Sequence, residues 1–171
     1  MRSVISITLS ALVVLFSLTA CGSTDQPQLT AQERTELYRA AIEGARSSQE
    51  NADRPIITAE DEGYETLLEL LGLSQGDLSA FALSASMMNV QAYGVAAVYP
   101  AEGKDEAVRA GLQGFIDRQK QSFELYLADQ YEIASNARLE TLSDGTIVLV
   151  MCADQDTVFQ SMRERIESGK L

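Results

Sequence analysis

The sequence contains no histidine and no tryptophan, and it has only two cysteines and three prolines. Without histidine, the chain cannot build a Ser-His-Asp or Cys-His catalytic arrangement, a histidine zinc site or the usual proton shuttle at neutral pH. The lack of tryptophan also weakens the case for a site that stacks sugars on an aromatic ring. No glycine-rich phosphate loop, CxxC, HExxH or GxSxG motif occurs. These absences remove most of the catalytic classes that a sequence can reveal.

Positive charge is scarce as well. The chain has 13 lysine and arginine residues against 25 aspartate and glutamate residues, so its formal net charge is −12. A protein this acidic repels nucleic-acid phosphates and anionic lipid headgroups, and we therefore expect no nucleic-acid partner. Solubility of an exported protein is the favoured explanation of this charge, and selection for a basic protein or a cation as partner is the alternative.

The long apolar run lies at the N-terminus. Val4–Leu18 follows Arg2 and is apolar apart from scattered serine and threonine. It has the length of a signal-peptide core and is short for a membrane span. It ends at Leu18-Thr19-Ala20-Cys21, which resembles the bacterial lipobox: a leucine three residues before a cysteine and a small residue directly before it. The resemblance implies diacylglycerol on Cys21 and cleavage between Ala20 and Cys21. An ordinary signal peptide or anchor that contains a cysteine is the alternative.

An anchor at Cys21 sets the predicted domain organisation. We expect a signal peptide over residues 1–20, the lipidated cysteine with a flexible tether over 21–30, and a single globular domain over 31–171. Two acyl chains anchor a protein stably, and no second apolar stretch approaches the length of a span. The expected location is extracytoplasmic, on the outer leaflet of the cytoplasmic membrane in a monoderm. Outer-membrane delivery in a diderm stays open, because Gly22 and not aspartate follows the cysteine.

The second cysteine, Cys152, has no intrachain disulfide partner if Cys21 carries lipid. It ends the apolar run Thr146–Cys152. This run is continuous and rich in β-branched residues, which predicts a central strand covered on both faces. A buried, inert thiol is therefore favoured over a reactive one.

The first part of the predicted domain, residues 31–77, is helical. Thr30 and Glu33 have the spacing of a capping box. The acidic run Glu60–Glu62 lacks EF-hand spacing, so carboxylates near a helix N-terminus are favoured over a calcium site, and no metal site is predicted. The predicted elements are a helix over Thr30–Arg46, a loop over Ser47–Pro55 and a short helix over Tyr64–Leu71 ended by Gly72.

The second part, residues 78–168, has the pattern strand–turn–strand–helix twice. The predicted fold is α+β: a four-stranded, mostly antiparallel sheet with the two helices of these units packed on one face. The preceding N-terminal helices would cover what remains. The predicted elements are strands over Phe81–Met88 and Tyr93–Tyr99, a helix over Lys104–Leu127, strands over Ala137–Leu142 and Thr146–Cys152, and a last helix capped by Asp154 or Asp156.

Three short elements of this second part carry a resemblance. They are Met87-Met88-Asn89 between the first two strands, the segment QKQSFE at 119–124, and the turn from Tyr126 to Tyr131. Over Glu65–Ile166 the sequence resembles a family of small uncharacterised lipoproteins, mainly from monoderm bacteria, known only as a domain of unknown function. The resemblance implies residence outside the cytoplasmic membrane and supplies no activity and no catalytic residues.

The same elements provide the candidate contact residues. Met87, Met88 and Asn89 form a soft apolar rim with an amide, and Tyr126 and Tyr131 suit a wet interface. The favoured alternatives are structural: one methionine faces the core while Asn89 takes the left-handed position of a turn, and the tyrosines belong to a helix C-terminus packed on the sheet edge.

Two classes of function remain. The first is a membrane-anchored, non-catalytic binding or interaction module of the cell envelope, without a cofactor and with an envelope protein as partner. The alternative is a carboxylate-dependent envelope hydrolase or transferase, with acidic residues at the helix starts after Tyr99 and Cys152. That alternative requires two carboxylates to converge in a deep cleft. A small-solute receptor is disfavoured, because a domain of this size lacks the two lobes that usually close around a solute.

Overall fold

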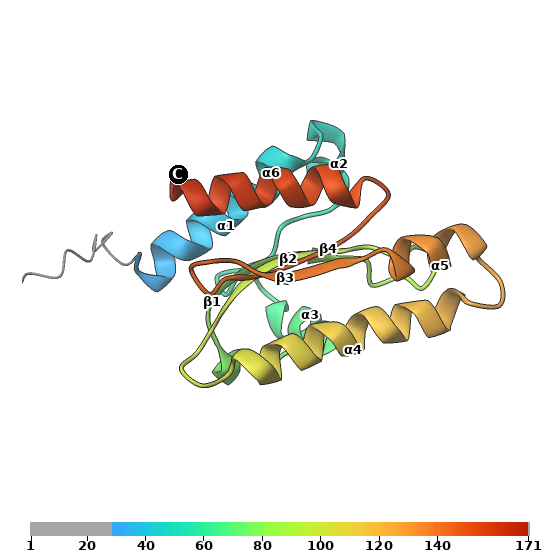
Figure 1. The fold of residues 1–171 in the computed structure, drawn as a ribbon, viewed down its shortest axis with the longest axis horizontal. Coiled ribbons are helices and arrows are strands. Elements are labelled where there is room, and N and C mark those ends of the chain that lie inside the picture. Colours follow the sequence, from blue (N-terminus) through green and yellow to red (C-terminus); the bar gives the residue numbers. More distant parts are fainter. Residues whose placement is uncertain (1–28, 171) are drawn as a thin grey trace, which may run out of the picture.

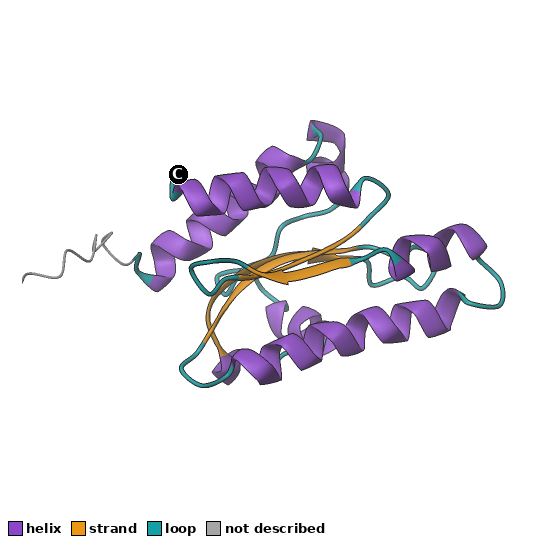
Figure 2. Ribbon diagram, in the orientation of Figure 1, coloured by secondary structure: helices purple, strands orange, loops and turns teal. Residues whose placement is uncertain are grey.

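A computed structural model describes residues 29–170 and contains six α-helices, one 3-10 helix and a four-stranded sheet within them. The sheet lies between two layers of helices (Figures 1 and 2). The fold is therefore α+β, as predicted. Ala20, Cys21 and the rest of the lipobox lie outside the described residues, so the lipid anchor stays a prediction. Within residues 29–170 no helix has the length and apolar character needed to cross a membrane.

Capping boxes begin the first two helices. At the start of α1 (Ala31–Ala45), the Thr30 hydroxyl accepts a hydrogen bond from the Glu33 N–H, and the Glu33 carboxylate accepts one from the Thr30 N–H. The same reciprocal pair starts α2 (Ser48–Asp53), where a loop was predicted. That prediction was wrong because α2 buries no residue and so shows no apolar periodicity.

The short helix α3 (Tyr64–Leu71) has the predicted bounds and ends at Gly72, whose φ is 75°. Gly72 also touches α4 (Asp105–Phe123), because a Cβ added at Gly111 of α4 would lie 2.1 Å from the Gly72 carbonyl oxygen. Only glycine at position 111 permits this approach, and the contact fixes α4 against the end of α3.

All neighbouring strands of the sheet pair antiparallel, in the order β1-β2-β4-β3. The interior strand β4 is buried at every position, which confirms the predicted central strand. The first strand begins and ends three residues earlier than predicted, because it continues directly from the 3-10 helix Gln75–Asp77. The strands are β1 (Leu78–Ala85), β2 (Gly94–Pro100), β3 (Arg138–Thr141) and β4 (Ile147–Met151).

The long helix α4 ends at Phe123, four residues before its predicted end, and α5 (Ala128–Ser135) follows where no helix was predicted. Phe123 is the last buried residue of α4, whereas Leu125 is 93% exposed. The residues directly after Phe123 are exposed, and the chain turns before it meets the core again at Leu127. The last helix, α6 (Gln155–Ser168), buries the four residues predicted to share a face: Val158, Phe159, Met162 and Ile166.

Helices cover both faces of the sheet (Figure 1). The expectation that the helices of the two strand–turn–strand–helix units share one face was wrong, because α4 and α6 pack on opposite faces. We call the face covered by α3, α4 and α5 the α4 face, and the face covered by α1 and α6 the α1 face. The central strands are buried at successive positions, so their alternating side chains need an apolar layer on each side. Leu149 packs on the α4 face, for example, and its neighbour Val150 on the α1 face.

Candidate functional site

Five large hydrophobic side chains are exposed among the described residues, and two loops carry all of them. One loop joins β1 to β2 and the other joins α4 to α5, and both lie at the same end of the molecule, beside α5 (Figure 1). A group of exposed apolar side chains marks a contact surface for another molecule. We call this surface the apolar tip; it consists of Met87, Met88, Val90, Leu125 and Tyr126, whose exposed fractions are 69%, 71%, 64%, 93% and 59%.

Hydrogen bonds connect the two loops of the apolar tip. The Tyr126 hydroxyl donates to the carbonyl oxygen of Asn89 at 3.1 Å. The Ala92 N–H donates to the side-chain oxygen of Gln130, at the start of α5, at 2.9 Å. The ring of Tyr126 also lies against Phe123, with 6.1 Å between ring centroids. The exposed side chains therefore stand on loops that are fastened to one another and to the core.

The structure brings four of the five predicted contact residues together at this end. The fifth, Tyr131, is half-buried and packs into the core of the α4 face. The expectation that one methionine faces the core was wrong: β1 ends at Ala85, so Met87 and Met88 both fall in the loop. The sequence analysis missed Val90 and Leu125. An apolar residue inside a predicted turn was the available signal for Val90.

The apolar tip continues into a shallow hollow of about 370 Å³. Met87 lines it together with residues from α3 and α4. The guanidinium of Arg118 closes one side and donates to the Leu70 carbonyl at 2.8 Å. A bound partner would therefore meet an apolar rim next to a concave wall that holds one cation.

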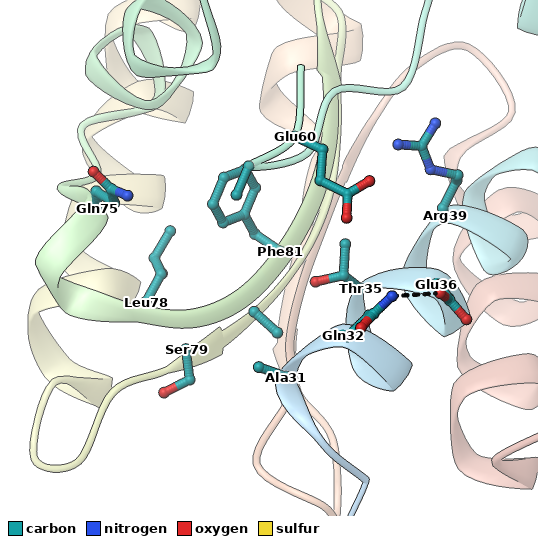
Figure 3. Close-up of a pocket in the computed structure, with 12 residues that line it drawn as sticks. Ala31, Gln32, Thr35, Glu36, Arg39, Glu60, Gln75, Leu78, Ser79 and Phe81 are labelled. Atoms are coloured by element: carbon teal, nitrogen blue, oxygen red, sulfur yellow. Dashed lines mark hydrogen bonds between the residues drawn. The ribbon is translucent and has the colours of Figure 1, made fainter. Parts of the chain in front are cut away.

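A second hollow, of about 380 Å³, lies between β1 and α1 (Figure 3). We call it the edge groove. Its walls come from α1, from the turn at Ala59 and Glu60, and from Gln75, and β1 forms its floor. The residues of α1 and β1 that line it are Ala31, Gln32, Thr35, Glu36 and Arg39, and Leu78, Ser79, Ala80 and Phe81.

Cys152 directly follows β4 and is buried, as predicted. Burial raises the pKa of its thiol to about 11, so the thiol is protonated at neutral pH. It borders a hollow of about 210 Å³ in which Arg54 stacks on the ring of Tyr93, 4.0 Å from the ring centroid. A protonated, buried thiol is a poor nucleophile, which agrees with the inert reading.

Three carboxyl groups of the N-terminal helical part have a lowered pKa: Glu33, Glu50 and Asp61. In each case the main cause is a hydrogen bond from the backbone N–H of the residue three positions earlier. These groups act as caps of helices and turns in their ionised form.

The acidic residues proposed for a hydrolase or transferase do not converge. They follow β2, at Glu102 and Asp105, and β4, at Asp154 and Asp156. Because β2 and β4 are antiparallel, with Gly94 opposite Met151, the ends of these strands lie at opposite ends of the sheet. Over residues 29–170, no cluster of three or more acidic or cysteine side chains has the geometry to hold a metal ion.

Comparison with known proteins gives one match. Residues 50–153 match the family described as "Domain of unknown function (DUF4358)". This segment contains the whole sheet, the helices of the α4 face and the apolar tip, whereas α1 and α6 lie outside it. No curated protein and no solved structure matches the chain.

Proposed function

Because the chain belongs to the DUF4358 family, which has no assigned activity, we propose a function from its own surface. The protein is an extracytoplasmic lipoprotein, held on the membrane through a lipid on Cys21, and acts as a non-catalytic interaction module of the cell envelope. The apolar tip is the observation that carries this proposal. It gathers all the large hydrophobic side chains that the described chain exposes, and it does so on two connected loops.

The partner is an envelope protein and not the bilayer itself. The exposed residues Glu124, Asp129 and Glu132 lie in or next to the α4–α5 loop that carries Leu125 and Tyr126, and their carboxylates repel anionic headgroups. Apolar side chains with charged residues nearby suit a protein interface, in which an apolar centre is bordered by a polar rim. The partner should therefore carry an apolar patch with basic residues at its border.

The arrangement of the two ends supports the same partner. The start of α1 and the apolar tip lie at opposite ends of the long axis of the domain (Figure 1). A lipid on Cys21 would attach the chain on the side of α1. The apolar tip would then be remote from the attachment point and accessible to a neighbouring protein.

Photo-crosslinking in cells tests the role of the apolar tip. A photoreactive amino acid at Met88 should capture a discrete envelope protein, and the same amino acid at the exposed Glu164 of α6 should not. Combining the Met88 probe with Leu125→Asp should abolish the adduct, while circular dichroism shows an unchanged fold. Equal adducts at both positions, or none at Met88, would contradict the proposal.

Metabolic labelling with a fatty acid tests the anchor separately. The wild-type chain should incorporate the label, and Cys21→Ala should not. The same incorporation in both chains would remove the anchor from the proposal and leave the crosslinking result at the apolar tip unaffected.

A further inference from the structure

The edge groove contains an unpaired part of the outer edge of β1. Because β1 is an edge strand, only its β2 side is covered by the sheet. On the outer side, Ile57 exchanges two main-chain hydrogen bonds with Leu83, at 2.7 Å and 2.9 Å. This single-residue bridge shows that the outer edge has the geometry to accept an antiparallel strand.

The next outward-facing residue along β1 is Phe81. In an antiparallel ladder, the N–H and C=O of alternate residues point to the same side, so Phe81 faces outward like Leu83. No described residue bonds its N–H or its C=O. Phe81 lines the edge groove, and the residue as a whole is only 4% exposed. Buried main-chain groups without a protein partner are rare, and the main chain of an added strand would satisfy both groups of Phe81.

The shape of the edge groove favours an extended segment over a second copy of this chain. Figure 3 shows α1 on one side of β1 and Glu60 reaching into the space above the strand. The outer edge of β1 lies below α1 and the turn at Ala59 and Glu60. These walls would keep the β1 strands of two copies from reaching each other. A single extended backbone can enter, and a hollow of about 380 Å³ is of the size that binds small ligands and short segments.

The charges of the walls favour a basic segment. Arg39 already bonds Thr58, at 3.0 Å, and Asp61, at 3.4 Å, so its charge is offset inside the protein. The carboxylates of Glu36 and Glu60 have no ion-pair partner within residues 29–170, and both are exposed. The groove therefore presents unpaired negative charge beside unpaired main-chain groups.

We propose that the edge groove binds an extended, basic segment of a partner polypeptide, which adds to β1 as a strand through the main chain of Phe81. The N–H and C=O of Phe81 supply the central pair of hydrogen bonds, and Glu60 pairs with a lysine or arginine of the segment. This site lies apart from the apolar tip, so either proposal can fail without the other.

A binding measurement on the full chain in detergent tests this proposal. The probe is a short fluorescent peptide in which valine and lysine alternate, and its anisotropy is followed as protein is added. It should bind saturably, and the same peptide with alternate amides N-methylated should not, because it cannot form the ladder. Hydrogen exchange should slow at the Phe81 amide on binding.

Two charge reversals provide the matched variants. Glu60→Lys places a cation in the groove and should weaken binding at least about threefold. Glu62→Lys makes the same change of net charge at an exposed residue that does not line the groove, and should leave affinity unchanged. A peptide with glutamate in place of lysine should show the reverse preference for Glu60→Lys.

The remaining outcomes overturn the proposal. It fails if the lysine peptide does not bind, or if the N-methylated peptide binds equally well. It also fails if the two variants weaken binding to the same degree, since general charge would then explain the affinity. Equal protection of the Phe81 amide with and without the lysine peptide would also overturn it, because no new hydrogen bond would then form at this residue.

Discussion

The two faces of the sheet are held in different ways. The α4 face is closed by an apolar cluster around Leu112, Phe115 and Leu149. On the α1 face, α1 also makes directed hydrogen bonds: the Tyr38 hydroxyl lies 2.7 Å from that of Thr146, and the guanidinium of Arg46 donates to Ser84 at 3.0 Å. The buried polar side chains among the described residues are Arg46, Thr58, Ser84 and Thr146, and each belongs to the end of α1 or bonds a residue of α1.

This difference shows how a helix outside the family match becomes part of the domain. Apolar contacts alone allow a helix to shift along a smooth surface, whereas hydrogen bonds have a direction and fix its position. Part of the α1 face is rich in alanine and includes Ala80, Ala82 and Ala97. Their short side chains leave few gaps into which side chains of α1 can lock. We infer that the polar bonds of Tyr38 and Arg46 define where α1 lies, and the following variants test this comparison.

Removing one large ring from each face should have the largest effect. Phe115→Ala on the α4 face and Phe159→Ala on the α1 face should each lower the free energy of unfolding by about 3–5 kcal/mol, because both rings are fully buried. Urea denaturation followed by circular dichroism measures both losses. A much smaller loss for Phe159→Ala would show that the α1 face is peripheral to folding.

Replacing the buried cation should have the next largest effect. Arg46→Met keeps much of the apolar stem but leaves the hydroxyls of Ser84 and Tyr93 without their donor. The free energy of unfolding should fall by about 1.5–3 kcal/mol. Arg163→Met, at an exposed ion pair of α6, is the control and should change stability by less than about 1 kcal/mol. Equal losses in the two variants would argue against a positioning role for Arg46.

Two glycine substitutions should change stability in opposite directions. Gly111→Ala on the α4 face should destabilise by about 1–3 kcal/mol, because the new methyl group would overlap the Gly72 backbone. Gly44→Ala in α1 meets no atom within 4 Å and should stabilise by about 0.5–1 kcal/mol. Melting temperatures of the two variants measure the contrast, and a stable Gly111→Ala protein would show that α3 and α4 can separate.

Acid should weaken the N-terminal helical part by a smaller amount. The pKa values of Glu33, Glu50 and Asp61 are lowered in the folded protein, so the unfolded chain binds more protons as the pH falls. Their stabilisation is full above the ordinary values of 4.5 for Glu and 3.8 for Asp, and it is lost as the pH falls through the lower folded values. The triple variant Glu33→Gln, Glu50→Gln, Asp61→Asn should show a flatter dependence of melting temperature on pH than the wild-type chain.

Asp129→Asn in α5 is the control for this pH series, because the pKa of Asp129 is lowered mainly by the side chain of Gln130 and not by a helix cap. It should keep most of the wild-type pH dependence. A pH profile of the triple variant that overlays the wild-type profile would mean that the caps contribute nothing in the folded state.

The sequence predicted the elements whose signals are local. The bounds of α3 follow from its apolar pattern and Gly72, and the burial of β4 follows from its continuous apolar run. Cover on both faces was predicted for β4, but the placement of α4 and α6 on opposite faces was not, although β2 is as continuously apolar as β4 and carried the same signal. The short helix α5 fully buries only Ala134, so no amphipathic pattern revealed it.

For the candidate site, the sequence predicted which residue types could form a contact surface, but not whether those residues are exposed. Met87 and Met88 suggested a contact surface, but their exposure depends on where β1 stops, and pairing of Ala85 with Gly94 decides that point. The edge groove had no sequence signal. Thr35, Glu60 and Phe81 meet there from three separate segments. The free main chain of Phe81 follows from the edge position of β1 and from the limit of the Ile57 bridge to Leu83.

The bond between Tyr126 and Asn89 has a consequence for how tightly the proposed partner is held at the apolar tip. Loops that are mobile before binding lose conformational entropy when a partner orders them, and this loss reduces affinity. Here the hydroxyl of Tyr126 and the side chain of Gln130 already restrict the β1–β2 loop. Tyr126→Phe should therefore leave the apolar surface intact and yet weaken the complex through faster dissociation, because rigidity itself contributes to binding.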